Sequence, residues 1–544
     1  MVDLTFLDMI WIALFVGLMI ALALLFYRLS KRSQSDFFLA GRGLPWWLPA
    51  TSVYATHTGT DTPIWYSGVI YQYGLAGMWY GFFATWCSIS AFASAKIFRR
   101  SLSYTQAEWQ TLRFSGLGAE LSRGWLSGWR AFMDIFTVGW MNAAIYMICN
   151  YLFGWPFWLS FLVFTVSVAI YVTTSGYWGV VMADFQQGIF VLIVIVLVSV
   201  IGISVAGGPA GILSSLESMG KEWMANPFAF KEFGGGLPLA WFLTMFFAAI
   251  IAGFGMGSHT DWYTEAQRIQ SAKTLKDSSY CMWAGPALVI IRNALWAVAI
   301  LAFFVLSPNL LPPNPANPPP LHQAAEMAWY RIGFDYLPEV SAGLLGFFIA
   351  AIIGIHFSTV STHLNLGASY LTRDLYQHYI NPEASEQRLV WGGRISTLII
   401  LAGSFFFGWM MKAEITSWLI FTMWIMMAGT WIPNILQVVW WRFNIKGWLA
   451  AWIANMGLAW IVVWILPSVN ILSGLLDYQQ FWILLALSAL IYLPVTLLTK
   501  PEPTEHLVRF YVMARPYGWW GPIRKEAERR GLIKPIEKTK GGQK

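Results

Sequence analysis

Four hydroxyl side chains lie close together in an otherwise apolar stretch of the sequence: Ser358, Thr359, Ser361 and Thr362. One or two such hydroxyls usually bond back to their own helix or join neighbouring helices. Four within so short a stretch exceed what this role requires. Ser358, Ser361 and Thr362 have the i, i+3, i+4 spacing that places side chains on one helix face. Because a hard monovalent cation binds several oxygen atoms at close range, the stretch predicts a sodium site.

A second polar stretch, "ATSVYATHTGTDTPIWYSG" at 50–68, carries His57 and Asp61 among apolar residues. Gly59 and Pro63 predict that a helix is interrupted here, because proline lacks an N–H group and crowds the carbonyl four residues earlier. An interrupted helix exposes backbone carbonyls, which membrane proteins tolerate only around a cavity or an ion. Such breaks point to transporter binding sites. The alternative is a proline kink packed between helices.

Two further charged residues are expected inside the membrane, where a charge costs at least about 2.5–3.5 kcal/mol. Asp184 would supply the formal charge of a sodium site, or its carboxylate would reach the membrane interface. Arg292 must face protein or water, and it could bind an anionic group or pair with a carboxylate such as Asp61.

The composition indicates a polytopic α-helical membrane protein. Apolar residues make up 57% of the chain and charged residues 11%, whereas soluble domains average about 25% charged residues. Apolar runs of about 20 residues, long enough to cross a bilayer, recur along the chain. We expect thirteen spans, at about 7–27, 46–70, 75–97, 128–152, 157–176, 180–206, 239–258, 281–306, 341–371, 391–411, 416–440, 447–467 and 479–499.

The basic residues predict the orientation of these spans. They follow the first, third, seventh, ninth and eleventh spans, for example at Arg28, Arg99, Arg268, Arg373 and Arg442. Because lysine and arginine gather in cytoplasmic loops, we expect an external N-terminus, an internal C-terminus and a cytoplasmic position for Arg268. The same rule places the basic tail from residue 500 in the cytoplasm.

Three segments outside the spans have distinctive compositions. The outer loop 207–238 is expected to contain a short surface helix. The outer loop 307–338 contains "SPNLLPPNPANPPP", which is expected to be an extended polyproline-type segment. The tail contains "RPYGWWGP", which favours a position along the membrane surface. None of these segments resembles a soluble catalytic domain, so we do not expect an enzyme.

Several ordered motifs carry a resemblance to a known family. They are "SQSDFFLAGRGLPWW" at 33–47, the stretch around the predicted break, "GVVMADFQQ", "EAQRIQSAKTLKDSSY" and "STVSTHLNLGASYLTRDLY". In this order they resemble the sodium:solute symporter family, which includes bacterial sodium/galactose, sodium/proline and sodium/sialic-acid symporters. The resemblance covers about residues 5 to 500.

The resemblance implies a LeuT-like fold of two inverted five-helix repeats. The corresponding divisions are an extra N-terminal helix and cytoplasmic loop at 1–45, a first repeat at 46–206, an outer loop at 207–238, a second repeat at 239–446, two C-terminal helices at 447–499 and a basic cytoplasmic tail at 500–544. It also implies sodium as the coupling ion. The family's common sodium site maps to Ala55, Thr58, Ile355, Ser358 and Thr359. A second sodium site, present in some members, maps to Asp184, Ser358, Ser361 and Thr362.

The solute site departs from the galactose-type pattern of the family. It also departs from the proline-type pattern, because His57 stands where that pattern has an ionic residue in the first core helix. The candidate solute residues are His57, Asp61, Thr62, Trp65, Tyr80, Trp262 and Arg292. Aromatic rings with a carboxylate and an imidazole suit a small amphiphilic solute, cationic or zwitterionic, through cation–π contacts. Stacking aromatics also bind sugars, so the solute class stays open.

The resemblance implies a sodium-coupled symporter that imports a small organic solute across the cell membrane by alternating access. Two alternatives remain. One is a sodium-conducting channel, which would require a filter-like loop, and the other is a sensor on a transporter fold, which would resemble a transporter in sequence.

The partners expected of a symporter are the solute, sodium ions and the lipid bilayer, and no nucleic acid is expected.

Overall fold

The computed structural model describes residues 4–83, 90, 93–254, 262–310, 325–411 and 426–534. Within these ranges the chain is helical, and its extended pairings are isolated bridges rather than sheets. Eight helices in the described ranges are long and apolar enough to cross a bilayer. They are Phe6–Ser30, Gly116–Phe153, Phe157–Val205, Leu275–Leu306, Leu344–Ile380, Glu386–Met411, Ile445–Ser468 and Asp477–Leu498. The chain is therefore an integral membrane protein.

The expected interruption of the second span is present. Helix α3 (Trp47–Thr56) ends before His57, and helix α4 (Thr62–Tyr73) begins after Asp61. Pro63 occupies the first turn of α4, where a missing N–H group costs nothing. The sequence thus starts a new helix rather than bending the old one.

Two expected spans, 157–176 and 180–206, form one helical segment with a sharp turn in it. The segment Phe157–Val205 includes α9 (Phe157–Ser160), a π-helical stretch (Phe161–Val166) and α10 (Ser167–Val205). At Gly176 the backbone leaves the helical region with φ 55° and ψ −156°. This left-handed φ favours glycine, and a side chain there would also contact Phe37 at 2.9 Å.

Other expected spans are described only in part. The third is a 3-10 helix at Gly74–Phe83 followed by α6 (Ala95–Ser101), and residues 84–89 lie outside the described ranges. The seventh is α12 (Leu239–Phe254), after which α13 (Trp262–Ser271) begins. Of the eleventh, 416–440, the structure describes only the end, with α19 at Trp431–Val439.

The structure describes parts of three connecting segments about which the sequence makes predictions. Residues 311–320 of the proline-rich stretch that is predicted to be extended lie outside the described residues. Later in the same segment, α15 (Ala328–Val340) buries an apolar face that includes Trp329 and Phe334. The tail forms α23 (Thr504–Ala514) and α24 (Gly521–Arg529), and Trp520 between them is buried, its Nε1 donating to the Val438 carbonyl at 2.7 Å. The tail therefore packs on protein at that tryptophan, and its position along the membrane surface stays a prediction. The expected surface helix in 207–238 is α11 (Gly208–Ser218).

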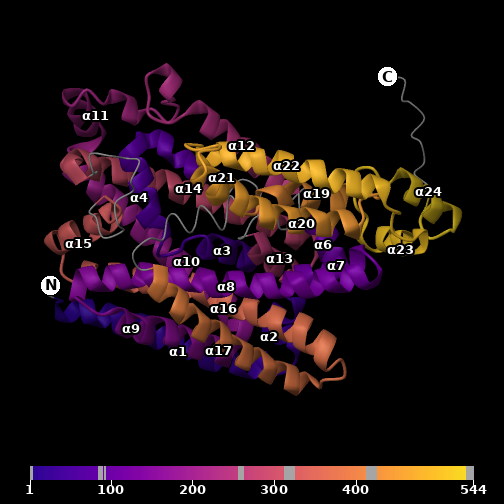
Figure 1. Ribbon diagram of the computed structural model, residues 1–544. Helices are drawn as coiled ribbons and strands as arrows, with labels where there is room; N and C mark the ends of the chain where they lie inside the picture. The colour runs from indigo at the N-terminus through magenta and orange to yellow at the C-terminus, as the bar shows by residue number, and fades with distance from the viewer. Residues whose placement is uncertain are drawn as a thin grey trace, which may run out of the picture.

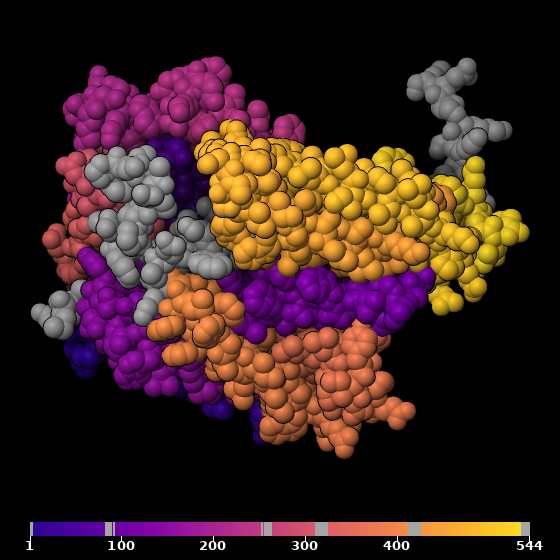
Figure 2. Space-filling model, in the orientation of Figure 1, coloured from indigo at the N-terminus to yellow at the C-terminus, as the bar shows by residue number. Residues whose placement is uncertain are grey.

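Figure 1 shows long helices running side by side, with α1 (Phe6–Ser30), α16 (Leu344–Ser369) and α17 (Glu386–Met411) on one side of α8 (Gly116–Phe153). On the face seen in Figure 2, the C-terminal helices, including α20 (Ile445–Trp460) and α22 (Asp477–Leu498), form an orange and yellow layer over α8. The N-terminal end of α1 and the tail helix α24 lie at opposite ends of this bundle (Figure 1). Helix α3 is internal, because it contacts α10, α13, α14 (Leu275–Leu306) and α16.

The contact between α3 and α14 depends on Gly285. A β-carbon added at Gly285 would lie 2.7 Å from Cβ of Val53 and 2.8 Å from the Ala50 carbonyl. We expect Gly285→Ala to lower the thermal unfolding midpoint of the purified protein, since forcing extra carbon into a packed interface costs about 1–3 kcal/mol. Gly128→Ala on α8, which meets nothing within 4 Å, is the matched control and should be neutral or slightly stabilising. Equal midpoints for the two variants would contradict this account of the interface.

Candidate functional site

The hydroxyl cluster of α16 meets the broken end of α3. Thr359 Oγ1 donates to the Thr56 carbonyl at 3.1 Å and to the Ile355 carbonyl of its own helix at 3.5 Å. Thr56 is the last residue of α3. The final carbonyls of a helix lack intrahelical partners and carry partial negative charge. This junction therefore combines hydroxyl and carbonyl oxygens in a way that favours a cation.

The five residues of the predicted first sodium site are all buried. Ala55 lies on α3 and Thr58 just after its end, and the other three lie on α16. Ala55 accepts the Thr58 N–H at 3.0 Å. The Thr58 hydroxyl donates to Tyr54 of α3 at 2.7 Å and accepts Arg292 Nη1 at 2.5 Å. Ser358 turns its hydroxyl toward Asp184. Thr359 is thus the member of the set that bridges α16 and α3 directly.

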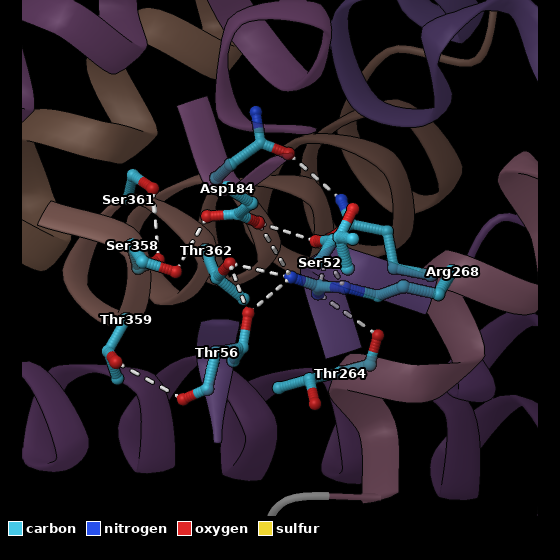
Figure 3. Close-up of polar contacts among 12 residues, drawn as sticks. Ser52, Thr56, Asp184, Thr264, Arg268, Ser358, Thr359, Ser361 and Thr362 are labelled. Atoms are coloured by element: carbon cyan, nitrogen blue, oxygen red, sulfur yellow. Dashed lines mark hydrogen bonds and ion pairs between the residues drawn. The ribbon is translucent and has the colours of Figure 1, made fainter. Parts of the chain in front are cut away.

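Three members of the predicted second site also lie together (Figure 3). Asp184 Oδ1 accepts the Ser358 hydroxyl at 2.7 Å, and Thr362 Oγ1 lies 3.1 Å from Thr56 Oγ1. Asp184 is completely buried on α10 and does not reach the interface. Ser361 differs, because its hydroxyl donates to the Ser358 carbonyl at 3.0 Å. This is the back-bonding role that a single helical hydroxyl usually has.

Three residues of this cluster were not expected from the sequence: Ser52, Thr56 and Arg268. Ser52 and Thr56 have the i, i+4 spacing that places them on one face of α3, which is a signal that could have been used. Arg268 was expected only as one of the basic residues that mark the cytoplasmic side, but its side chain is fully buried in the protein. Its guanidinium lies 3.6 Å from Asp184 Oδ2, so charge pairing stabilises its burial.

His57 lies at the break and pairs with a residue that the sequence did not single out. Its Nε2 is 2.5 Å from Glu265 Oε1, and the Glu265 side chain is 1% exposed. The pair joins the end of α3 to α13. Beside it, the Thr62 hydroxyl accepts the Gly59 N–H at 3.2 Å and contacts Asp61 Oδ1 at 3.4 Å. Two carboxylates thus lie at the break: Asp61 belongs to it, and Glu265 reaches it from α13.

Arg292 is buried against the same break. Its Nη1 donates to the His57 carbonyl and to Thr58 Oγ1, both at 2.5 Å. Its guanidinium lies over the Trp296 ring, 4.6 Å from the centroid. A positive charge at the carbonyl end of α3 is favourable. Arg292 therefore stabilises the break after α3. Its direct contact with the solute stays a prediction.

The expected aromatic residues are placed on separate elements. Trp65 on α4 meets Tyr66 edge-on at 5.3 Å between centroids. Tyr80 stacks on Trp241 at 3.6 Å and on Tyr73 at 5.9 Å. Trp262 is the first residue of α13, and its side chain lies outside the described part of the structure.

Comparison with known proteins decides the family. The sequence model of the sodium:solute symporter family matches residues 37–455. The chain belongs to the sodium:solute symporter family. This match covers the break, Asp184, Arg268 and the hydroxyl cluster of α16, so the site described above lies within the family's own sequence pattern.

Members of this family with diverse solutes resemble the chain. It is 25% identical over 422 residues to the sodium/glucose cotransporter of Vibrio parahaemolyticus, covering 73% of this chain and 74% of the relative. It is 24% identical over 506 residues to the osmoregulated proline transporter of Bacillus subtilis, covering 90% and 94%. The sodium/sialic acid symporter of Aliivibrio fischeri is 25% identical over 406 residues, with 72% and 74% covered.

Solved structures show the same fold. An outward-open, substrate-bound sodium-coupled sialic acid symporter aligns with a TM-score of 0.73 at 16% identity, covering 92% of this chain and all of the other. A closed nucleobase-cation-symport-1 family transporter aligns with a TM-score of 0.52 at 14% identity, covering 88% and 99%. Both are LeuT-like transporters, so the chain has this all-helical transporter fold.

Proposed function

We propose that this chain is a sodium-coupled symporter that moves a small organic solute across the cell membrane by alternating access. Its membership of the sodium:solute symporter family and its transporter fold support this. The observation that carries the proposal is the contact of Thr359 Oγ1 with the last carbonyl of α3. At this point a hydroxyl-bearing helix meets an interrupted one, which is the arrangement that transporters use to coordinate a coupling ion.

The first sodium is proposed to bind between the α3 end and α16, using Ala55, Thr58, Ile355, Ser358 and Thr359. A second cation site is proposed beside it at Asp184, Ser358, Ser361 and Thr362. Carbonyl and hydroxyl oxygens replace water around the ion without the cost of burying several carboxylates.

The fold is proposed to consist of two inverted five-helix repeats, at 46–206 and 239–446. The extra helix of 1–45, the outer loop 207–238, the two helices of 447–499 and the cytoplasmic tail 500–544 lie outside them. The first repeat would then start with the interrupted helix α3–α4. The second would start with α12 and α13, and residues 255–261 between them lie outside the described residues. We propose thirteen spans with an external N-terminus. An odd number of spans places the termini on opposite sides of the membrane, which is consistent with the opposite positions of α1 and α24 in Figure 1.

The solute is proposed to bind at the break in α3–α4, near His57, Asp61, Thr62, Trp65, Tyr80, Trp262 and Arg292. Glu265 joins this group because it contacts His57. Two carboxylates and several rings favour an amphiphilic solute with a positive group. The named relatives carry glucose, proline and sialic acid, so membership of the family by itself leaves the solute class open.

The proposal is tested by finding the solute and then measuring its uptake. The purified chain is screened by thermal shift against sugars, amino acids, carboxylates and amines, each in sodium and in potassium. A ligand that binds the folded state raises the midpoint, and we expect the true solute to do so more strongly in sodium. Uptake into proteoliposomes should then require an inward sodium gradient.

The same measurement separates the alternatives. Uptake that is equally fast in potassium would contradict sodium coupling. Sodium flux that needs no solute would favour a channel, and sodium-dependent binding without any transport would favour a sensor.

A further inference from the structure

The guanidinium of Arg268 lies directly beside Asp184 and Thr362 of the proposed second cation site (Figure 3). One nitrogen, Nη2, donates to the hydroxyls of Thr56 and Thr362, both at 2.7 Å, and lies 3.6 Å from Asp184 Oδ2. Nε donates to Ser52 Oγ at 3.0 Å. The guanidinium is therefore held by oxygens from three helices, α3, α10 and α16.

The remaining contacts of Arg268 leave it little freedom. Nη1 donates to the Thr264 carbonyl at 3.1 Å, and Cζ lies 5.8 Å from the Tyr177 ring centroid. Ser52 in turn donates to Asp184 Oδ2 at 2.5 Å. Such a fixed, planar set of donors is what makes arginine suited to buried ion pairs. The Arg268 side chain is therefore a fixed part of this polar cluster.

The Thr362 hydroxyl oxygen would be a ligand both of Arg268 and of a sodium ion in the second site. This oxygen accepts Arg268 Nη2 at 2.7 Å and lies 3.1 Å from Thr56 Oγ1. A sodium ion ligated by Thr362 and Asp184 would have to occupy the space next to the guanidinium. Both cations would then compete for the same oxygens.

Charge balance points in the same direction. Asp184 is the carboxylate that contacts this cluster within the described residues, and Arg268 already balances it. Glu265, one turn away on α13, is paired with His57 instead. A sodium ion added to the cluster would leave one uncompensated positive charge in a buried site, which is strongly unfavourable. One cation fits, and two do not.

We infer that Arg268 is a tethered cation that takes the place of sodium in the second site. The inference deepens the proposed function and rests on it for the first sodium site. In this chain Asp184 and Thr362 contact the guanidinium directly, and Ser358 is turned to Asp184 instead, so the protein binds sodium at the first site alone. Removing the arginine's charge opens the second site to sodium.

The test counts bound sodium ions on the purified full-length chain, using radiolabelled sodium at saturation. We expect one ion per wild-type chain and two per Arg268→Gln chain. Arg268→Lys keeps the charge and should bind one. Arg268→Gln combined with Asp184→Asn removes the carboxylate that the added ion needs, and should return the count to one. Arg268→Met serves as a second neutral variant if Arg268→Gln folds poorly.

A thermal measurement gives an independent readout. Arg268→Gln leaves Asp184 without its buried cation, so its unfolding midpoint should rise more on adding sodium than that of the wild type does. A wild-type count of two, or an Arg268→Gln count equal to that of the wild type, would overturn the inference. A wild-type chain that binds no sodium would refute the proposed function instead. The inference would then still require a gain of one ion in Arg268→Gln.

Discussion

Alanine at both Ser358 and Thr359 should raise the sodium concentration needed for half-maximal stabilisation or transport by at least about tenfold. Tenfold corresponds to about 1.4 kcal/mol of lost binding free energy. The double variant removes two proposed ligands and also the Thr359 contact with the Thr56 carbonyl at the end of α3. The measurement is the unfolding midpoint of the purified chain as a function of sodium concentration, followed by sodium-dependent uptake once the solute is known.

Ser369→Ala is the matched control for this double variant. Ser369 is also a buried serine on α16, but its hydroxyl donates to Leu366 of the same helix at 2.7 Å. It should leave the sodium dependence unchanged. If the double variant responds to sodium as the wild type does, Ser358 and Thr359 are not sodium ligands, and the first site must be placed elsewhere.

Asp184→Asn should be among the most destabilising single substitutions in the chain. It keeps the size of the side chain but leaves the Arg268 guanidinium without its buried counter-charge. Removing one partner of a buried ion pair costs about 3–5 kcal/mol. We therefore expect a large drop in the thermal unfolding midpoint of the purified protein.

Two comparisons isolate the electrostatic part of this effect. Asp335→Asn breaks the partly exposed Arg331–Asp335 pair on α15, where the N–O distance is 3.2 Å, and should cost no more than about 1 kcal/mol. Asp184→Asn combined with Arg268→Gln removes both charges and should recover much of the lost stability. A double variant no more stable than Asp184→Asn would show that the two charges are not coupled.

The occupant of the second site sets how strongly the chain can concentrate its solute. One sodium ion moving down 100 mV releases about 2.3 kcal/mol, and a tenfold gradient adds about 1.4 kcal/mol. These free energies support accumulation of a neutral solute on the order of several-hundred-fold for one ion. Two ions would support on the order of 10⁵-fold. With Arg268 in the second site, the lower ceiling applies.

The sequence by itself determined the features that depend on neighbouring residues. The break between α3 and α4 follows from Gly59 and Pro63, which act on their own turn of the helix. The apolar runs determined a helical membrane protein, because hydrocarbon requires every backbone group to be paired within its own segment. The hydroxyl spacing on α16 likewise identified a polar helix face, from which Ser358 meets Asp184 on α10 and Thr362 meets Thr56 on α3.

Only the tertiary structure decided which residues meet across the chain. Arg268 follows an apolar span and is basic, so its sequence position indicates a cytoplasmic loop, but α13 brings it to Asp184 from 84 positions away. Ser361 stands among the other hydroxyls in sequence and bonds to its own helix. Contacts of this kind arise when separate helices pack, and the free energy of a buried charge depends on the partner that packing supplies. No local pattern contains that partner.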